Sequence, residues 1–175
     1  MKKVSIVMLA LVTSMVAGNL SFESGMIKAH TEMVADSTID PVTKKINSHL
    51  SMESDPKTLR GSVDISMLDL ISDNKKRDEH MQETVESSLF PKTVFEVKEV
   101  VAKGGDNYSL KGTMSLHGMS KPMSFDGSIV EDGNKVRIKA TGALKMTDFG
   151  IVPPSMMFMK VRDQVDLAVD ISLKR

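Results

Sequence analysis

Hydrophobic and polar residues alternate along most of the chain after residue 25. In the segment 107–117 the apolar side chains fall on one face: Tyr108, Leu110, Met114 and Leu116. A period of two places successive side chains on opposite faces of a β-strand. The alternation predicts eight strands, near residues 26–35, 45–54, 59–69, 93–102, 107–117, 121–131, 135–147 and 164–174.

Short turn-forming sequences separate the predicted strands. Gly104-Gly105-Asp106-Asn107 and Glu131-Asp132-Gly133-Asn134 both fit hairpin turns. Strands joined by such turns pair antiparallel. The resulting meander forms either a sandwich or a closed barrel, and we expect an all-β, up-and-down antiparallel barrel because closure removes exposed strand edges.

One segment, residues 73–83, breaks the alternation. It is highly charged, and Ser72 and Asp73 are both favourable helix N-cap residues. We therefore expect a short helix here, between the third and fourth strands.

The first 18 residues have the pattern of a secretory signal peptide. Lys2 and Lys3 precede an apolar run from Val4 to Val16, and Ala17 and Gly18 are small enough for cleavage. The run is shorter than the roughly 20 residues that span a bilayer as a helix. We expect export, with residues 1–18 removed, one domain over residues 19–175 and no stable membrane insertion. The alternative is an uncleaved membrane anchor.

Charge and composition narrow the class of partner. The chain has 23 basic and 23 acidic residues, and loss of Lys2 and Lys3 leaves a slight excess of acids. This balance argues against nucleic acid, which requires a basic patch, and against electrostatic docking on an anionic membrane. Cysteine is absent, so the fold has no disulfide.

The predicted inward faces are rich in methionine, leucine and small residues, and the chain has no tryptophan. Such a lining leaves the barrel axis incompletely filled, and flexible thioethers adapt to an apolar guest. The alternative is that the methionines pack a dry core, and both interpretations stay open from the residues alone. The candidate lining residues are Val63, Ile65, Met67, Phe95, Leu110, Met114, Leu116, Phe125, Ile138, Leu144, Leu167 and Val169.

Neither a metal site nor a catalytic site is predicted. The four histidines share no ligand spacing with a third ligand, and the chain has no cysteine nucleophile, Gly-x-Ser-x-Gly elbow or phosphate loop. The run Met156-Met157-Phe158-Met159 fits either Cu(I) binding or, as we prefer, an apolar lid. We therefore expect a protein that is not an enzyme and has no cofactor.

Several short motifs occur in an order and spacing that indicate a particular protein family more specifically than the alternation does. They are Arg77-Asp78-Glu79-His80-Met81, Phe90-Pro91-Lys92-Thr93-Val94-Phe95, the hairpin from Tyr108 to Pro122, and Thr147-Asp148-Phe149-Gly150-Ile151. Together they resemble the YceI family of bacterial periplasmic proteins. The chain departs from the family pattern at its first strand, where only Ile27-Lys28-Ala29-His30-Thr31 corresponds.

The resemblance implies a periplasmic, eight-stranded, lipocalin-like barrel that holds a long isoprenoid lipid, such as a polyprenyl phosphate or a ubiquinone-like quinone. Arg77 and His80 share one face of the predicted helix, where they are suited to receive a phosphate or a quinone oxygen at the barrel mouth. Alternatively, Arg77 and Asp78 hold the helix against the barrel wall.

Two other functions remain open. One is a non-catalytic periplasmic stress or interaction module with a side-chain-filled barrel. The other is an enzyme that acts on a lipid inside the barrel. A homodimer is compatible with each of these functions.

Overall fold

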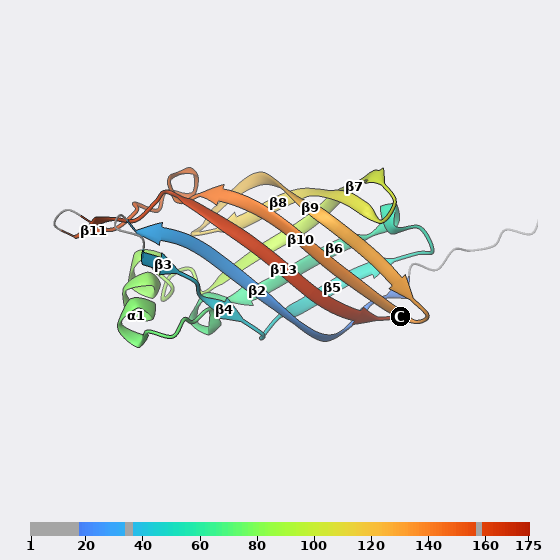
Figure 1. Ribbon diagram of the computed structural model, residues 1–175, viewed down its shortest axis with the longest axis horizontal. Coiled ribbons are helices and arrows are strands. Elements are labelled where there is room, and N and C mark those ends of the chain that lie inside the picture. The colour runs from blue at the N-terminus through green and yellow to red at the C-terminus, as the bar shows by residue number, and fades with distance from the viewer. Residues whose placement is uncertain (1–17, 34–36, 157–158) are drawn as a thin grey trace, which may run out of the picture.

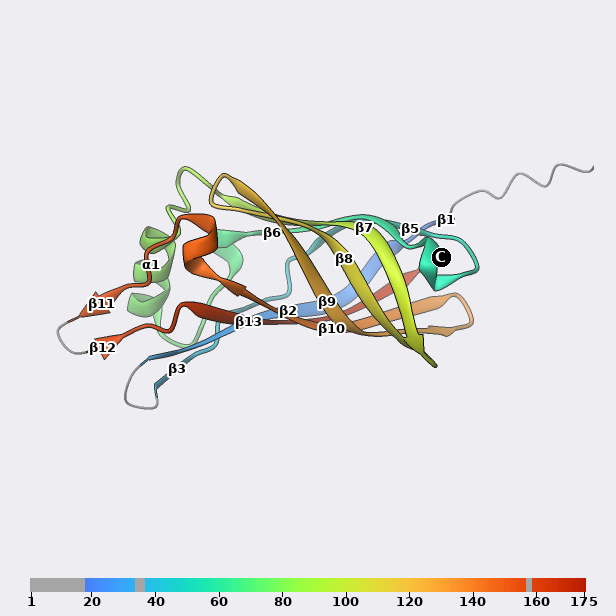
Figure 2. The same cartoon turned by 90° about the horizontal axis from the view of Figure 1, so that it is seen from above.

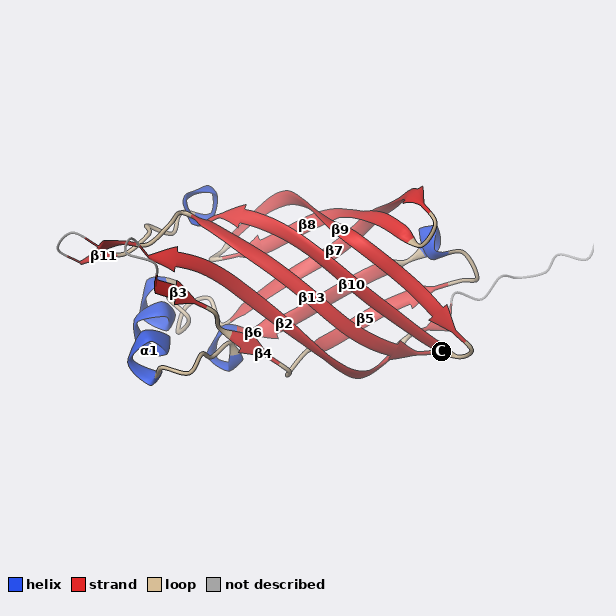
Figure 3. Ribbon diagram, viewed as in Figure 1, coloured by secondary structure: helices blue, strands red, loops and turns tan. Residues whose placement is uncertain are grey.

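The computed structural model describes residues 18–33, 37–156 and 159–175. Mostly antiparallel strands form a curled half-barrel, and the helical segments lie at its ends (Figures 1 and 3). Three sequence predictions fall partly outside the described residues: the signal peptide, the end of the first predicted strand, and the run Met156-Met157-Phe158-Met159.

In the described part of the chain the main sheet has eleven strands, not the eight that alternation predicted. The longer strands are β2 (Ser21–Met33), β5 (Asn47–Met52), β6 (Arg60–Ser66), β7 (Lys92–Gly104), β8 (Asn107–Leu116), β9 (Met119–Asp132), β10 (Lys135–Lys145) and β13 (Gln164–Lys174). The additional strands are β1 (Gly18–Asn19), β3 (Ser37–Ile39) and β4 (Val42–Thr43). Two or three residues are too few to produce an alternating pattern, so the sequence did not reveal them.

The strands follow the order β1-β5-β6-β7-β8-β9-β10-β13-β2-β3, with β4 also paired to β2. Only Leu20 separates β1 from β2, although β1 pairs with β5 and β2 pairs with β13. The Leu20 amide donates a hydrogen bond to the Leu50 carbonyl over 2.8 Å. Residues 18–33 therefore pair with strands at both ends of the sheet order, β5 and β13.

Helix α1 (Lys75–Thr84) lies between β6 and β7. Its N-cap is Asn74, whose side chain accepts a hydrogen bond from the Arg77 amide at 3.1 Å, so the expected caps, Ser72 and Asp73, were wrong. Among the described residues, three 3₁₀ turns accompany α1: η1 (Pro56–Thr58), η2 (Met67–Asp69) and η3 (Met146–Phe149). Two of them, η2 and η3, replace the last residues of two predicted strands. A separate hairpin joins β11 (Ser155–Met156) to β12 (Met159–Lys160).

The connections gather at two opposite ends of the sheet. Helix α1, η2, η3 and the β11–β12 hairpin lie at one end, called here the mouth end (Figure 2). At the other, closed end, the core is tightly packed, because Met52, Ile129, Val136 and Leu173 are at most 1% exposed. The two ends of the sheet therefore differ in packing as well as in loop content.

Close strand contacts depend on glycines within the sheet. A Cβ atom on Gly127 of β9 would lie 1.9 Å from the Lys139 carbonyl oxygen of β10, and one on Gly112 of β8 would lie 2.0 Å from the Glu96 carbonyl oxygen of β7. Any other residue would push these strands apart. Glycine within a strand commonly marks such a close backbone approach.

Asp40 connects β2 to the segment between β3 and β4. Its carboxylate lies 2.9 Å from the Lys28 ammonium and 2.6 Å from the His30 Nδ1. Hydrogen bonds from Lys28 and His30 lower the pKa of Asp40 from 3.8 to about 2. The hydrogen bond with Asp40 in turn raises the pKa of His30 above 6.5.

We expect this cluster to make stability depend on pH. The lowered Asp40 pKa contributes stability that is present above the unfolded value of 3.8 and lost as the pH falls towards about 2. The raised His30 pKa contributes stability that is present below 6.5 and lost as the pH rises through the folded value. Asp40→Asn should therefore lower the free energy of unfolding by about 1 kcal/mol near pH 5, since both side chains are partly screened by water.

Urea unfolding of the wild-type protein and of Asp40→Asn at several pH values tests this prediction. The difference between the two proteins should shrink as the pH rises above 6.5 through the folded pKa of His30, and it should disappear below pH 2. An equal difference at every pH would contradict the proposed cause.

Candidate ligand-binding cavity

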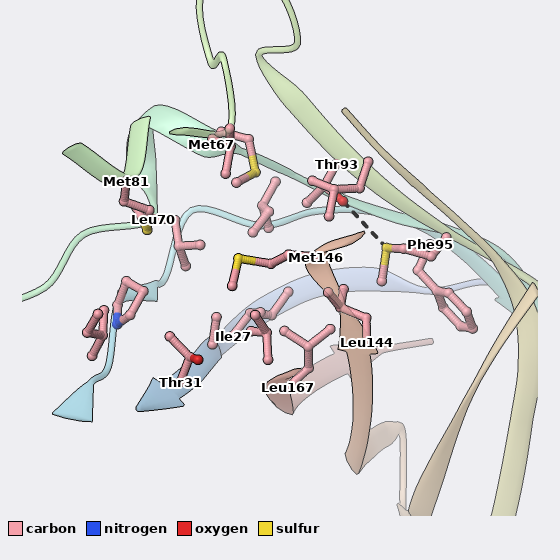
Figure 4. A pocket seen from close by; sticks show the side chains of 18 of the residues that line it. Ile27, Thr31, Met67, Leu70, Met81, Thr93, Phe95, Leu144, Met146 and Leu167 are labelled. Atoms are coloured by element: carbon pink, nitrogen blue, oxygen red, sulfur yellow. Dashed lines mark hydrogen bonds between the residues drawn. The ribbon is translucent and has the colours of Figure 1, made fainter. Parts of the chain in front are cut away.

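The half-barrel is hollow in its mouth half. A cavity of about 620 Å³ lies between the sheet and α1, within the range of roughly 300–1,000 Å³ that is typical of ligand pockets. Apolar side chains dominate its wall, and Ile27, Leu144 and Leu167 converge on it from three strands (Figure 4). Its size and lining make it a candidate site for an apolar molecule.

All of the predicted lining residues border this cavity. They are Val63, Ile65, Met67, Phe95, Leu110, Met114, Leu116, Phe125, Ile138, Leu144, Leu167 and Val169. The structure also places Arg77 and His80 on the cavity wall. Contact between these residues and a ligand stays a prediction.

On strands β10 and β13 the cavity ends between one inward-facing residue and the next. On β13 Ile171 borders the cavity, but Leu173, the next inward residue, does not. On β10 Ile138 borders it, but Val136 does not. On these two strands the closed end of the core is therefore filled by side chains, whereas on the opposite wall the cavity reaches Leu50 and Leu59.

Several lining residues are only partly buried although they belong to the hydrophobic core. Val63, Leu116, Leu167 and Val169 pack against the buried cluster and also border the cavity. A side chain beside a void lacks neighbours on that side and loses their dispersion contacts. A bound apolar chain would supply those contacts.

Two aromatic rings stiffen the wall. Phe95 on β7 and Phe125 on β9 meet edge to face, with ring centroids 4.8 Å apart and an interplanar angle of 70°. Gly112, on the strand between them, leaves space for Phe95, since a Cβ there would lie 2.9 Å from the ring. Edge-to-face aromatic pairs add about 0.5–1.5 kcal/mol beyond their buried area.

Sequence reasoning missed part of the lining. Strand β2 contributes Ile27, Ala29, Thr31 and Met33, whose alternation is weak because Ala29 is small and Thr31 is polar. The remaining missed residues come mainly from α1 and the loops at the mouth, where no strand period applies: Leu70, Met81, Thr84, Val85, Ile151, Pro154 and Val161.

Helix α1 places basic side chains beside the cavity opening. Lys76, Arg77 and His80 border the cavity, and His80 is exposed. The Arg77 guanidinium donates a hydrogen bond to the Thr38 carbonyl at 2.7 Å and lies 3.2 Å from the Asp73 carboxylate. Arg77 thus holds α1 against the segment that contains β3 while it remains beside the opening.

Asp78 stabilises the loop before α1. It is buried, and its Oδ1 accepts hydrogen bonds from the Ser72 amide at 2.8 Å and the Ser72 hydroxyl at 2.6 Å. These bonds fix the loop before α1, and Asp78 is not among the residues that border the cavity. They support a structural role for Asp78 in this loop, and its expected contact with the barrel wall stays a prediction.

A histidine that sequence reasoning did not select joins three segments at the mouth. The His117 Nδ1 lies 2.9 Å from the Phe149 carbonyl oxygen, and its Nε2 lies 2.6 Å from the Glu86 carboxylate. The Phe90 ring packs against the imidazole with centroids 4.6 Å apart. His117 thereby connects the end of α1, the β8–β9 turn and η3.

Among residues 18–33, 37–156 and 159–175, no three His, Cys, Asp or Glu side chains come together as metal ligands. The expectation for Met157 and Phe158, as a lid or a Cu(I) site, lies outside the described residues. No helix in the described part of the chain is long and apolar enough to span a membrane.

Comparisons with known proteins agree with this architecture. The BcnA structure from Burkholderia cenocepacia superimposes with a TM-score of 0.74 at 13% identity, over 85% of this chain and 95% of BcnA. The YCEI protein of Campylobacter jejuni gives a TM-score of 0.56 at 16% identity, over 99% of this chain and 91% of that protein. At these identities the likeness concerns the fold alone.

Among sequence relatives, a UPF0312 protein of Serratia proteamaculans is 29% identical over 107 residues, and one of Pectobacterium atrosepticum is 28% identical over 107 residues. The match covers 57% of this chain and 55% of either relative, so the chain spans about half the length of the curated relatives it matches. A family model described as a YceI-like domain matches residues 12–173, and the chain therefore belongs to the YceI-like family.

Proposed function

We propose that this protein binds a long isoprenoid lipid, a polyprenyl phosphate or a ubiquinone-like quinone, and carries it in the periplasm after export. The apolar tail lies in the cavity, and the polar head lies beside α1. The observation that carries the proposal is the apolar cavity of about 620 Å³ that ends blindly at the closed end and has cationic side chains at its mouth.

Tail burial supplies the affinity in this proposal. Each buried CH₂ group contributes about 0.8 kcal/mol, so a fifteen-carbon tail contributes about 12 kcal/mol. Association costs about 4–15 kcal/mol in lost freedom of motion, and only the difference appears as affinity. A tail of this length is therefore near the minimum for tight binding, which favours a long isoprenoid as the natural guest.

The head group is received at the first turn of α1. Lys76 and Arg77 lie there, where the helix N-terminus adds a partial positive charge. Arginine and lysine both donate charge-assisted hydrogen bonds to phosphate, and they also donate to a quinone oxygen. This position orients the ligand with its head outward and its tail towards the closed end.

The cavity weighs against the two alternative functions. A side-chain-filled interaction module does not need an open interior. An enzyme that acts on a buried lipid needs a titratable pair at the reacting atoms, and among the described cavity residues the ionisable ones, Lys76, Arg77 and His80, are all basic and all on α1. The absence of catalysis and the homodimer stay predictions.

Replacing Arg77 or Lys76 by methionine should weaken binding of farnesyl phosphate about tenfold and leave binding of farnesol unchanged. The loss reflects one charge-assisted hydrogen bond, which contributes about 1.5–3 kcal/mol. Lys75→Met is the matched control, because Lys75 is the adjacent cation, pairs with Glu79 at 3.7 Å and is not among the cavity residues. Isothermal titration calorimetry with both ligands measures the effect.

Equal losses for farnesol and farnesyl phosphate in Arg77→Met would contradict the head-group role. They would instead indicate that Arg77 acts by holding α1 against Thr38. If the wild-type protein bound neither compound, the lipid-binding function itself would be wrong.

A further inference from the structure

Exposed hydrophobic side chains gather at the mouth end. Among the described residues, the four most exposed large hydrophobic side chains are Val152 (79%), Leu89 (68%), Leu68 (53%) and Ile71 (51%). All four lie in the connections at this end, and Met119 (39%) begins β9 there. We call these five residues the mouth rim.

The mouth rim adjoins the opening of the cavity. Met67 and Leu70, the neighbours of Leu68 and Ile71, border the cavity, and so does Ile151, the neighbour of Val152. The rim residues come from four separate connections that meet at one end of the barrel (Figures 1 and 2). Exposed apolar side chains therefore lie next to the passage that a ligand would use.

Hydrogen bonds join the connections that carry the rim. The Met67 amide donates to the Pro91 carbonyl over 2.8 Å, which connects the Leu68 segment to the Leu89 segment. The two ring nitrogens of His117 contact Glu86 and Phe149, which connects the Leu89, Met119 and Val152 segments. The rim is thus held as one surface and not as independent loops.

We propose that the mouth rim docks reversibly on the surface of a lipid bilayer and that the ligand enters and leaves the cavity while the protein is docked. This inference rests on the proposed function, since it identifies where a membrane lipid is exchanged. The rim side chains enter the boundary between head groups and acyl chains, and the cavity mouth faces the bilayer.

The arrangement of the rim favours a bilayer over a protein partner. Binding energy in a protein interface is concentrated in a packed central cluster. Here the residues beside the rim border an open cavity, so a protein partner would face a hollow where its central contacts should be. A bilayer needs no complementary shape and fills the same opening with lipid.

The transfer of a lipid between the bilayer and the cavity is a second reason to favour a bilayer as the docking partner. A lipid that crosses water exposes its tail, at about 25 cal/mol for each Å² of apolar surface. Docking with the mouth against the bilayer removes this exposure along the whole path. Lys76 and His80 lie beside the opening at the level where phosphate head groups would be met. Apolar residues with nearby cations are typical of interfacial binding.

The test compares Leu89→Ser/Val152→Ser with the control Met26→Ser/Val130→Ser. Met26 and Val130 are exposed to 40% and 42% but lie on the strands β2 and β9, away from the mouth. We expect the rim variant to bind phosphatidylcholine vesicles at least about tenfold more weakly in flotation assays, because two apolar side chains no longer enter the bilayer. The control variant should float as the wild-type protein does.

A second measurement separates docking from ligand binding. Both variants should bind farnesyl phosphate in solution with wild-type affinity, and only the rim variant should extract a fluorescent isoprenoid from vesicles more slowly. Equal flotation of the rim variant and the control, or no flotation of the wild-type protein, would overturn the docking proposal and leave lipid binding intact. A rim-dependent dimer without vesicle binding would also overturn it and would identify a second copy as the occupant.

Discussion

Ile27→Trp together with Leu167→Trp should abolish isoprenoid binding, with a loss of affinity of at least about a hundredfold, and leave the barrel folded. Both residues are partly buried and point into the cavity from the neighbouring strands β2 and β13 (Figure 4). Two indole rings would occupy the space that the tail needs. Loss of only a few buried CH₂ groups already lowers affinity by this factor.

Ala168→Trp is the matched control for this experiment. Ala168 follows Leu167 on the same strand, but its side chain is exposed on the outer face. It should leave both affinity and melting temperature unchanged. If the double tryptophan variant bound farnesyl phosphate as tightly as the wild-type protein, the ligand would not lie in this cavity.

Leu173→Ala should destabilise the fold far more than Leu167→Ala, although both replace a leucine of β13. Leu173 is fully buried at the closed end, where a Leu→Ala change leaves a new void and costs about 3–5 kcal/mol. Leu167 already borders the cavity, so its truncation enlarges an existing space and should cost about 1 kcal/mol.

Chemical denaturation of the two single variants measures this difference. Addition of a saturating isoprenoid should stabilise Leu173→Ala as much as the wild-type protein, because its cavity is intact. Similar losses of stability in the two variants would contradict the division of the core into a filled half and a hollow half.

The inward-facing residues of the long strands could be predicted from the sequence for a simple physical reason. A strand that is dry on one face alternates strictly, so the apolar positions of β8, such as Leu110 and Met114, had to face one interior. The family resemblance added Arg77 and His80 through the motif at residues 77–81. These residues do border one cavity, even though the number of strands was underestimated.

The residues at the mouth of the cavity could be predicted from the sequence much less well. Residues such as Leu70 and Ile151 lie in loops beside 3₁₀ turns, where hydrophobic residues have no period that distinguishes a lining side chain from an exposed one. The same limit applies to the helix cap, since Ser72, Asp73 and Asn74 have similar capping preferences, and in the structure Asn74 caps the helix while Ser72 bonds to Asp78. The hollow interior also depends on packing, which the composition alone left undecided.

The asymmetry of the barrel would allow one small fold to combine stability with the proposed ligand site. Tightly packed residues such as Met52 and Ile129 hold the closed end together, so the mouth half can remain open. The loops at the mouth are joined through His117 and Asp78, which hold the opening in place without filling it. A carrier of a long lipid requires both features in the same molecule.

Native mass spectrometry tests the central claim most directly. The chain would be expressed with residues 1–18 in place in a bacterium that has a periplasm, purified from that compartment without detergent, and measured intact. The account predicts an adduct of one isoprenoid lipid or quinone per chain, which is lost in Ile27→Trp/Leu167→Trp. A bare mass, unchanged after incubation with a ubiquinone and with a polyprenyl phosphate, would contradict it.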